Sequence, residues 1–218
     1  MKEGDRNTRY FHAATKNRIA RNKITSIQDT TGVDIFGNQA VATEAERFFK
    51  DLFSCSSNPD LTAVISRIKP LVTKEMNDNL LGDITTEEIR SALFSIGRTK
   101  APGPDEFTAA FFQQYWEIVG PAIATEVKNF FSTGVMNKEW NHTNLCLLPK
   151  LNPPKTMKDF RPISLCNVLY KIISKILVKR LKSILSEVVS ENQAAFIPGR
   201  QITDNVLIAH EIHHSLRV

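Results

Sequence analysis

The strongest constraint on the fold is a long amphipathic helix that follows two short strands. The run TNLCLLPK at 143–150 predicts an apolar strand, LNPPKTMKDF at 151–160 a proline-rich turn, and RPISL a return strand. The helix needs a cap, for which Asp159 and Ser164 are the candidates. Apolar residues then recur at helical spacing, at Leu165, Val168, Leu169, Ile172, Ile173, Ile176, Leu177, Leu181, Ile184 and Leu185.

Positive charge is the second informative feature. The 218 residues carry a net charge of +5, with a pI of about 9.1, which favours nucleic acid or another anionic surface as a partner. Four lysines fall on one face of the predicted helix, away from the apolar residues, at Lys171, Lys175, Lys179 and Lys182. This face is either the solvated side of a core helix or a ridge that contacts phosphate groups.

The remaining patterns predict a mostly helical α+β protein with a small sheet. A hairpin is expected at 22–37, with its turn at Thr31-Gly32. Thr85 and Glu88 have the spacing of a helix capping box. Helices are expected near 39–53, 61–69, 84–97 with Gly97 as its end, 108–120, and from Pro121 to Phe131.

Cysteines, histidines and apolar runs argue against several kinds of site. No CxxC pair exists, so neither zinc nor a disulfide partner is expected, and Cys146 and Cys166 in apolar runs predict buried reduced thiols. His210, His213 and His214 lack a suitably spaced acid or cysteine, so we expect a helix surface there and no zinc site. No apolar run approaches the roughly 20 residues of a membrane span, and no membrane partner is expected.

Three loops rich in proline, glycine and basic residues are the candidate binding loops. Lys100 lies in KAPGPD, Lys150 and Arg161 flank the turn between the two predicted strands, and Arg200 lies in NQAAFIPGRQITDN. Lys150 and Arg161 on one hairpin would hold a polyphosphate or a nucleic acid backbone, because guanidinium and ammonium groups bind phosphate oxygens. The alternative is that Arg161 pairs with Asp159 or another carboxylate.

Several of these stretches resemble one family. LCLLPK and MKDFRPISLCNVLYKIISKILVKRLK, followed by SENQAAFIPGRQITDNVLIAHE, resemble the first conserved blocks of the reverse transcriptases of non-LTR retrotransposons, of the LINE type common in plants. KAPGPDEF resembles the block just upstream, in that family's N-terminal extension. GDRNTRYFHAATKNRIARNKI resembles the basic connector between the family's endonuclease and its polymerase.

The resemblance implies a domain order and a role for individual residues. Together with the local patterns it gives a basic connector and hairpin at 1–37, an acidic helical region at 38–97 that rests on charge and periodicity alone, the N-terminal extension at 98–142 and the start of the reverse transcriptase domain, the fingers, at 143–218. Lys150 and Arg161 would contact the triphosphate of the incoming nucleotide. Nucleic acid contacts would come from Lys100, Asp105, Lys171, Lys175, Gln193, Phe196, Gly199 and Arg200. The family usually has glycine where this chain has Glu106.

The family's catalytic acids have no counterpart in this sequence. A right-hand polymerase that copies RNA into DNA uses carboxylates on two divalent ions, Mg²⁺ being expected for the full-length enzyme, yet the sequence contains no Asp-Asp pair. We therefore expect an incomplete polymerase that lacks palm and thumb, binds RNA template, DNA primer and deoxynucleotide triphosphates, and is inactive alone. The resemblance suggests the nucleus or the cytoplasm.

Three alternatives remain open beside the polymerase fragment. The first is a non-catalytic RNA- or DNA-binding remnant or a binding module recruited by the host. The second is an inert remnant that folds poorly without its palm, in which Leu165, Ile172 and Ile176 would face water. The third is a helical scaffold protein that uses the acidic section.

Overall fold

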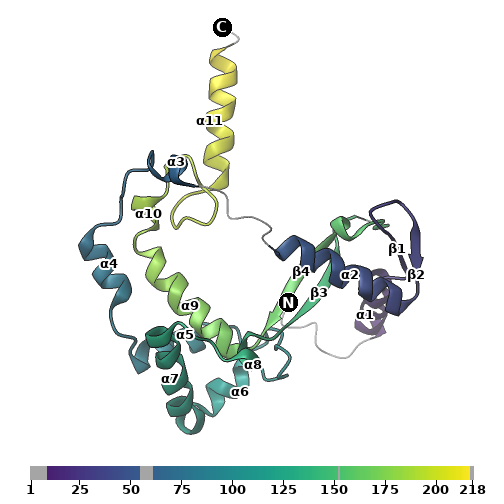
Figure 1. Cartoon of the computed structure of the whole chain (residues 1–218), viewed down its shortest axis with the longest axis horizontal. Helices are drawn as coiled ribbons and strands as arrows, with labels where there is room; N and C mark the ends of the chain where they lie inside the picture. The colour runs from purple at the N-terminus through teal and green to yellow at the C-terminus, as the bar shows by residue number, and fades with distance from the viewer. Residues whose placement is uncertain (1–8, 55–60, 152, 217–218) are drawn as a thin grey trace. The chain divides into compact units, whose positions relative to one another are not determined.

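The structure is a computed structural model that describes residues 9–54, 61–151 and 153–216, which are mostly helical with two small antiparallel sheets (Figure 1). The chain divides into two compact units, each with its own hydrophobic core. The first unit comprises residues 1–60 and 145–164, and the second comprises residues 61–144 and 165–218. The two strands after residue 142 each have residues in both units.

The first unit is built from two helices and two hairpins around a small core. Its buried apolar residues are Ile27, Val41, Phe49, Met157 and Phe160. Its elements are α1 (Arg9–Asn22), β1 (Ser26–Gln28), β2 (Asp34–Phe36), α2 (Asn38–Phe53), a short 3-10 helix (Met157–Asp159), and most of β3 (Thr143–Pro149) and β4 (Phe160–Cys166).

The β1–β2 hairpin confirms the prediction at 22–37. The strands pair antiparallel with Ile27 opposite Ile35. The Asp29 carboxylate closes the turn by accepting the main-chain N–H groups of Thr31 at 2.8 Å and Val33 at 2.9 Å. Helix α2 follows, as its apolar spacing predicts.

The second unit is helical, and its core joins α5, α7 and α9, which lie side by side (Figure 1). Ile172 and Ile176 of α9 have no exposed surface, and Leu165 is half-buried, so the expectation that these residues face water is wrong. Ile172 and Ile176 belong instead to the same hydrophobic core as Ile89 and Val127. The helices are α3 (Thr62–Ile65), α4 (Lys74–Leu81), α5 (Thr86–Phe94), α6 (Ala109–Gln114), α7 (Trp116–Thr133), α8 (Lys138–Asn141), α9 (Val168–Lys182), α10 (Leu185–Val188) and α11 (Ile202–Ser215).

Two predicted helix starts are wrong. Helix α9 begins at Val168 and its cap position is Asn167, because β4 runs on to Cys166 and so includes Ser164, while Asp159 ends the 3-10 helix before it. Helix α7 begins at Trp116, so Pro121 lies inside it. Only the first four N–H groups of a helix lack an internal acceptor, so this proline removes one hydrogen bond from α7.

Other details of the predicted helices also differ. Thr85 does cap α5, since its hydroxyl oxygen accepts the N–H of Glu88 at 3.1 Å, but the Glu88 carboxylate pairs with Arg180 and does not complete a capping box. Helix α5 ends at Phe94, before Gly97, and α3 is shorter than the predicted 61–69. Cys146 is exposed, against the expected buried thiol, because it lies on the outer face of a hairpin.

In the parts of the chain that the structure describes, no helix is both long enough and apolar enough to span a membrane.

Candidate nucleotide and nucleic-acid interface

The register of the β3–β4 hairpin places Lys150 and Arg161 on the same face. The Lys150 N–H donates to the Asp159 carbonyl oxygen at 2.7 Å, and at the other end of the hairpin the Thr143 hydroxyl reaches the Cys166 sulfur at 3.6 Å. Both contacts correspond to one antiparallel register, in which Arg161 lies opposite Leu148. Lys150 is then the diagonal neighbour of Arg161, at about 7–8 Å between Cα atoms.

The burial of the two strands follows this register. Lys150, Arg161 and their face neighbours Cys146, Leu148 and Ile163 are exposed. On the opposite face Leu145 and Ser164 are exposed, but the residues nearer the turn are half-buried or buried, and Leu147 and Phe160 pack in the core of the first unit against α2. Pro162 belongs to this inner face and fixes the backbone next to Arg161. Asp159, Arg161 and Pro162, which precede α9, therefore have different structural roles.

Arg161 has no ion pair among the described residues, so the alternative of a carboxylate partner is not what the structure contains. The Asp159 carboxylate instead accepts the N–H groups of Thr156 and Lys155, both at 2.9 Å. These bonds lower the pKa of Asp159 below its usual value, with a smaller effect from the Lys150 charge. The Lys150 ammonium group donates to the Lys158 carbonyl oxygen at 2.6 Å. Asp159 thus stabilises the turn of the β3–β4 hairpin, and the outer face carries the positive charges of Lys150 and Arg161.

The KAPGPD loop is held by Asn167, a residue that the sequence did not single out. Gly103 is buried, and a Cβ atom there would overlap Asn167 and lie 2.6 Å from the carbonyl carbon of Cys166. The Asn167 side chain accepts the N–H of Asp105 at 3.3 Å and donates to the Glu139 carbonyl oxygen at 3.0 Å. The position of Asn167 directly before α9, where asparagine is a favoured cap residue, was the sequence feature that could have identified it.

The turn in this loop explains why glycine is favoured at the position where this chain has Glu106. The Glu106 N–H donates to the Gly103 carbonyl oxygen at 3.0 Å, and the Asp105 carboxylate accepts the N–H of Phe107 at 3.1 Å. Glu106 then has φ of 61°, in the left-handed region that favours glycine. Asp105 therefore shapes the loop, while the Lys100 side chain remains exposed.

The lysine face of α9 is divided between internal contacts and solvent. Lys171 donates to the Ala101 carbonyl oxygen at 2.7 Å, which ties α9 to the KAPGPD loop, and Lys179 reaches the Ser91 hydroxyl at 3.5 Å. Lys175 is exposed and has no hydrogen bond or ion pair to another residue in the part of the chain that the structure describes. This face is thus partly solvated, and its contact with phosphate groups stays a prediction.

Arg200 organises the loop that follows α10. Its guanidinium donates to four carbonyl oxygens, those of Ser190 at 2.6 Å, Gln193 at 2.9 Å, and Ser186 and Val189 at 3.3 Å. In the same loop Phe196 has φ of 66° and is 97% exposed, and Gly199 has φ of 80°. Gln193 is also exposed. Arg200 thus donates hydrogen bonds to carbonyl groups at and after the end of α10, and the loop exposes the ring of Phe196 to solvent.

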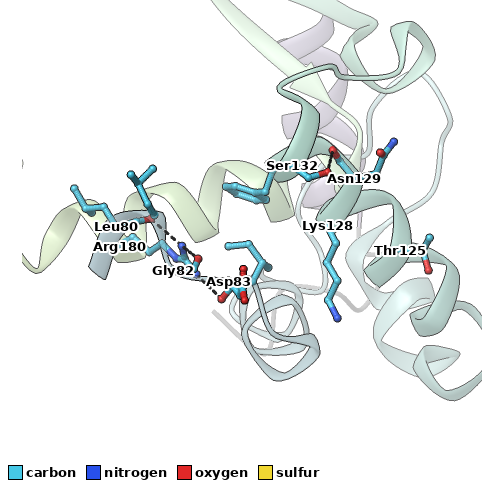
Figure 2. Close-up of a pocket in the computed structure, with 11 residues that line it drawn as sticks. Leu80, Gly82, Asp83, Thr125, Lys128, Asn129, Ser132 and Arg180 are labelled. Atoms are coloured by element: carbon cyan, nitrogen blue, oxygen red, sulfur yellow. Dashed lines mark hydrogen bonds between the residues drawn. The ribbon is translucent and has the colours of Figure 1, made fainter. Parts of the chain in front are cut away.

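A separate cavity of about 590 Å³ lies between α4, the α4–α5 connection and α7 (Figure 2). Arg180 borders it and donates to the Glu88 carboxylate at 2.8 and 2.9 Å and to the carbonyl oxygens of Leu80 at 2.8 Å, Gly82 at 2.6 Å and Asp83 at 3.1 Å. The Glu88 carboxylate raises the pKa of Arg180 above its usual value. None of the residues expected to bind nucleotide or nucleic acid lines this cavity.

The described side chains do not fit a divalent metal centre. Within residues 9–54, 61–151 and 153–216, no three His, Cys, Asp or Glu side chains come together in a way that would hold an ion. The three histidines of α11 are exposed on that helix.

Comparison with known proteins agrees with the motifs. Residues 149–217 match the model of the family described as reverse transcriptase (RNA-dependent DNA polymerase). Over 214 residues, 98% of this chain, the sequence is 33% identical to the transposon TX1 uncharacterized 149 kDa protein of Xenopus laevis, of which the chain spans 16%. Because this relative is an amphibian protein, the likeness to plant elements stays a prediction. Together the two matches support the identification of this chain as a fragment of a non-LTR retrotransposon reverse transcriptase.

Proposed function

We propose that the outer face of the β3–β4 hairpin binds the triphosphate of an incoming deoxynucleotide, as part of the fingers of a right-hand, RNA-directed DNA polymerase. The observation that carries this proposal is that Lys150 and Arg161 share one exposed face and that Arg161 has no carboxylate partner among the described residues. A planar guanidinium and an ammonium group on one face bind neighbouring phosphate groups, and Lys150 would exchange its hydrogen bond to the Lys158 carbonyl oxygen for one to phosphate.

The second unit supplies the proposed contacts with RNA template and DNA primer. Lys100, Lys175 and Gln193 are exposed and available to bind a nucleic acid backbone. Phe196 is available to stack on an unpaired base, since every base has an aromatic face. Asp105, Lys171, Gly199 and Arg200 act indirectly in this proposal, because they hold the loops that carry the contacting residues.

Mg²⁺ would neutralise phosphate charge and activate the attacking group in the complete enzyme. The described residues offer no centre for it. We therefore expect no nucleotide incorporation by this chain in primer extension on an RNA template with Mg²⁺ or Mn²⁺, and incorporation would contradict that expectation.

Nucleotide binding to the chain tests the proposal directly. Calorimetric titration with a deoxynucleoside triphosphate, and with inorganic triphosphate as the base-free probe, is expected to show weak binding. Arg161→Gln and Lys150→Gln should each weaken it about tenfold or more, since a hydrogen bond to a charged group is worth about 1.5–3 kcal/mol. Lys138→Gln on α8, also exposed, is the matched control. Equal affinity in all three variants would reject the hairpin as the site.

A second candidate is nucleic acid binding without chemistry. It is favoured by the exposed cations Lys100 and Lys175, which need no metal to bind phosphate. The same titrations separate the two functions: single-stranded RNA bound with a clear salt dependence, together with no triphosphate binding, would leave only this one.

A further inference from the structure

A row of aromatic side chains leads along the surface from the KAPGPD loop to the start of α7. Phe107, Phe111 and Tyr115 follow one another four positions apart, and the centroids of neighbouring rings are 4.8 Å and 5.1 Å apart. Phe107 and Tyr115 are 48% and 43% exposed, and Ile118 in the next turn is 76% exposed. Phe111 is half-buried against the hydrophobic core. Core packing thus accounts for the middle ring, while this aromatic row remains open to solvent at both ends.

Negative charge predominates in the sequence that contains the aromatic row. Between Lys100 and Lys128 the sequence has no Lys, Arg or His, although the whole chain has a net charge of +5. The acidic residues of this stretch are Asp105, Glu106, Glu117 and Glu126. Lys171, which reaches the same loop from α9, is engaged by the Ala101 carbonyl oxygen. The face of an aromatic ring is also negative, so the charge here favours a cationic partner over a nucleic acid.

Glu106, directly before the first ring, has a backbone conformation that costs stability. Its φ of 61° lies in the left-handed region, where a residue other than glycine is strained. Its side chain is exposed and forms no ion pair with any described residue. Backbone strain of this kind is concentrated at functional sites. Neither folding nor an internal partner thus accounts for a carboxylate at this position.

An arginine side chain is complementary to both parts of this surface. The planar guanidinium group stacks on aromatic faces and donates paired hydrogen bonds to a carboxylate. An ammonium group is a compact and more strongly hydrated charge, which stacks less well. In an extended peptide, alternate side chains point to the same face about 6.6 Å apart. Arginines on one face of such a peptide can therefore contact two rings of the aromatic row together.

We propose that the aromatic row and Glu106 form a docking surface for an extended, arginine-bearing segment of a protein partner. The guanidinium groups stack on Phe107 and Tyr115 and pair with the Glu106 carboxylate, and an apolar side chain of the segment covers Ile118. This function goes beyond the proposed nucleotide site, which lies on the β3–β4 hairpin.

The test is fluorescence anisotropy of a short labelled peptide of alternating arginine and glycine with the whole chain. Low salt is used because exposed ion pairs are screened as the salt concentration rises. The same peptide with lysine in place of arginine has equal charge and should bind at least about threefold more weakly. Phe107→Leu with Tyr115→Leu keeps apolar surface and should weaken binding of the arginine peptide about tenfold, since each exposed cation–ring contact contributes about two- to fivefold. Glu106→Gln should weaken it about threefold.

Matched variants control for loss of folding and for general effects of charge. Phe36→Leu with Phe53→Leu removes two exposed rings of the first unit, and Glu75→Gln removes an exposed carboxylate of α4; both should leave the affinity for the peptide unchanged. Urea unfolding followed by tryptophan fluorescence shows whether the second unit stays folded in each variant. Glu106→Gln changes only an exposed side chain, so it tests the proposal even if the leucine pair at the aromatic row unfolds.

Three results would overturn the proposal. They are an unchanged affinity in the leucine pair at the aromatic row or in Glu106→Gln, an equal loss in the control variants, and equal affinity for the lysine peptide. Binding of a single-stranded RNA probe should not depend on the aromatic row, and its loss in the leucine pair with peptide binding unaffected would assign the row to nucleic acid instead. Triphosphate binding to the β3–β4 hairpin should be unchanged in the leucine pair, so failure of one proposal is distinguishable from failure of the other.

Discussion

Arg180 is the side chain whose loss should most damage the second unit. Its guanidinium connects α9 to the Glu88 carboxylate on α5 and to three carbonyl oxygens at the end of α4 and in the α4–α5 connection, as Figure 2 shows in part. The Arg180 and Glu88 side chains are only 15% and 17% exposed. Arg180→Met keeps much of the volume and removes every one of these bonds.

The expected loss of unfolding free energy is about 3 kcal/mol. Each hydrogen bond to a charged group contributes about 1.5–3 kcal/mol, and Glu88 accepts two. Removing one partner of a fully buried pair costs about 3–5 kcal/mol, and the low end applies here because both side chains keep some contact with water. The Gly82 and Asp83 carbonyl oxygens are in exposed contacts and regain water, so they add little.

Urea unfolding followed by tryptophan fluorescence measures this loss. The protein has two tryptophans, Trp116 and Trp140, and both lie in the second unit, so the signal reports on that unit. With a slope of about 2 kcal/mol per molar urea, the midpoint should fall by about 1.5 M. The matched control is Arg90→Met on α5, whose guanidinium lies 4.6 Å from the centre of the Phe94 ring; its loss should be about 0.5–1 kcal/mol.

A double-mutant cycle assigns the effect to the pair. Arg180→Met and Glu88→Gln should be non-additive by about 1 kcal/mol or more, because the two residues are in direct contact. An Arg180→Met midpoint within error of that of Arg90→Met, or strictly additive effects, would refute this account of how α9 is attached.

Three further perturbations follow from the loops. Gly103→Ala should destabilise the second unit by about 3 kcal/mol in the same urea assay, because the new methyl group meets backbone atoms, whereas Gly82→Ala, with its nearest neighbour at 3.5 Å, should change stability by less than about 0.5 kcal/mol. Glu106→Gly should stabilise by about 0.5–1 kcal/mol, the relief of a left-handed residue less the added freedom of the unfolded chain; a loss of stability would show that the left-handed turn is absent. The Asp159 carboxylate has a lowered pKa, so the stability that it gives the hairpin tip is present above the usual value of 3.8 and is lost as the pH falls through the lower folded value. The amide NMR signals of Lys155 and Thr156 should titrate below pH 3.8 and not in Asp159→Asn, and titration in that variant would assign the effect to another group.

Elements with strong local patterns were predictable from the sequence. The β1–β2 hairpin, α2, α5, the β3–β4 hairpin and α9 all have apolar periodicity that matches their burial. Helix α4 was missed; it has only 8 residues and buries none of them. The division at Tyr115 between α6 and α7 was also missed, since the sequence predicted one helix over 108–120.

Of the candidate site, the sequence predicted only that Lys150 and Arg161 lie on the outer face of a hairpin. Strand alternation is sufficient to place Lys150 and Arg161 on the outside of a hairpin. The contacts that hold the other loops join distant residues: 62 positions separate Asp105 from Asn167, and 100 separate Leu80 from Arg180. Local periodicity contains no information on such pairs. For the same reason the sequence did not show that Arg200 is engaged by backbone carbonyl groups.

The most direct measurement for the central claim is an NMR titration of the ¹⁵N-labelled chain with a deoxynucleoside triphosphate and, separately, with inorganic triphosphate. If the outer face of the β3–β4 hairpin is the phosphate site, both ligands should shift the signals of Leu148, Lys150 and Arg161 while those of α1 and α9 stay in place. Shifts confined to α1 or to the lysine face of α9, with the hairpin signals unchanged at saturation, would contradict it.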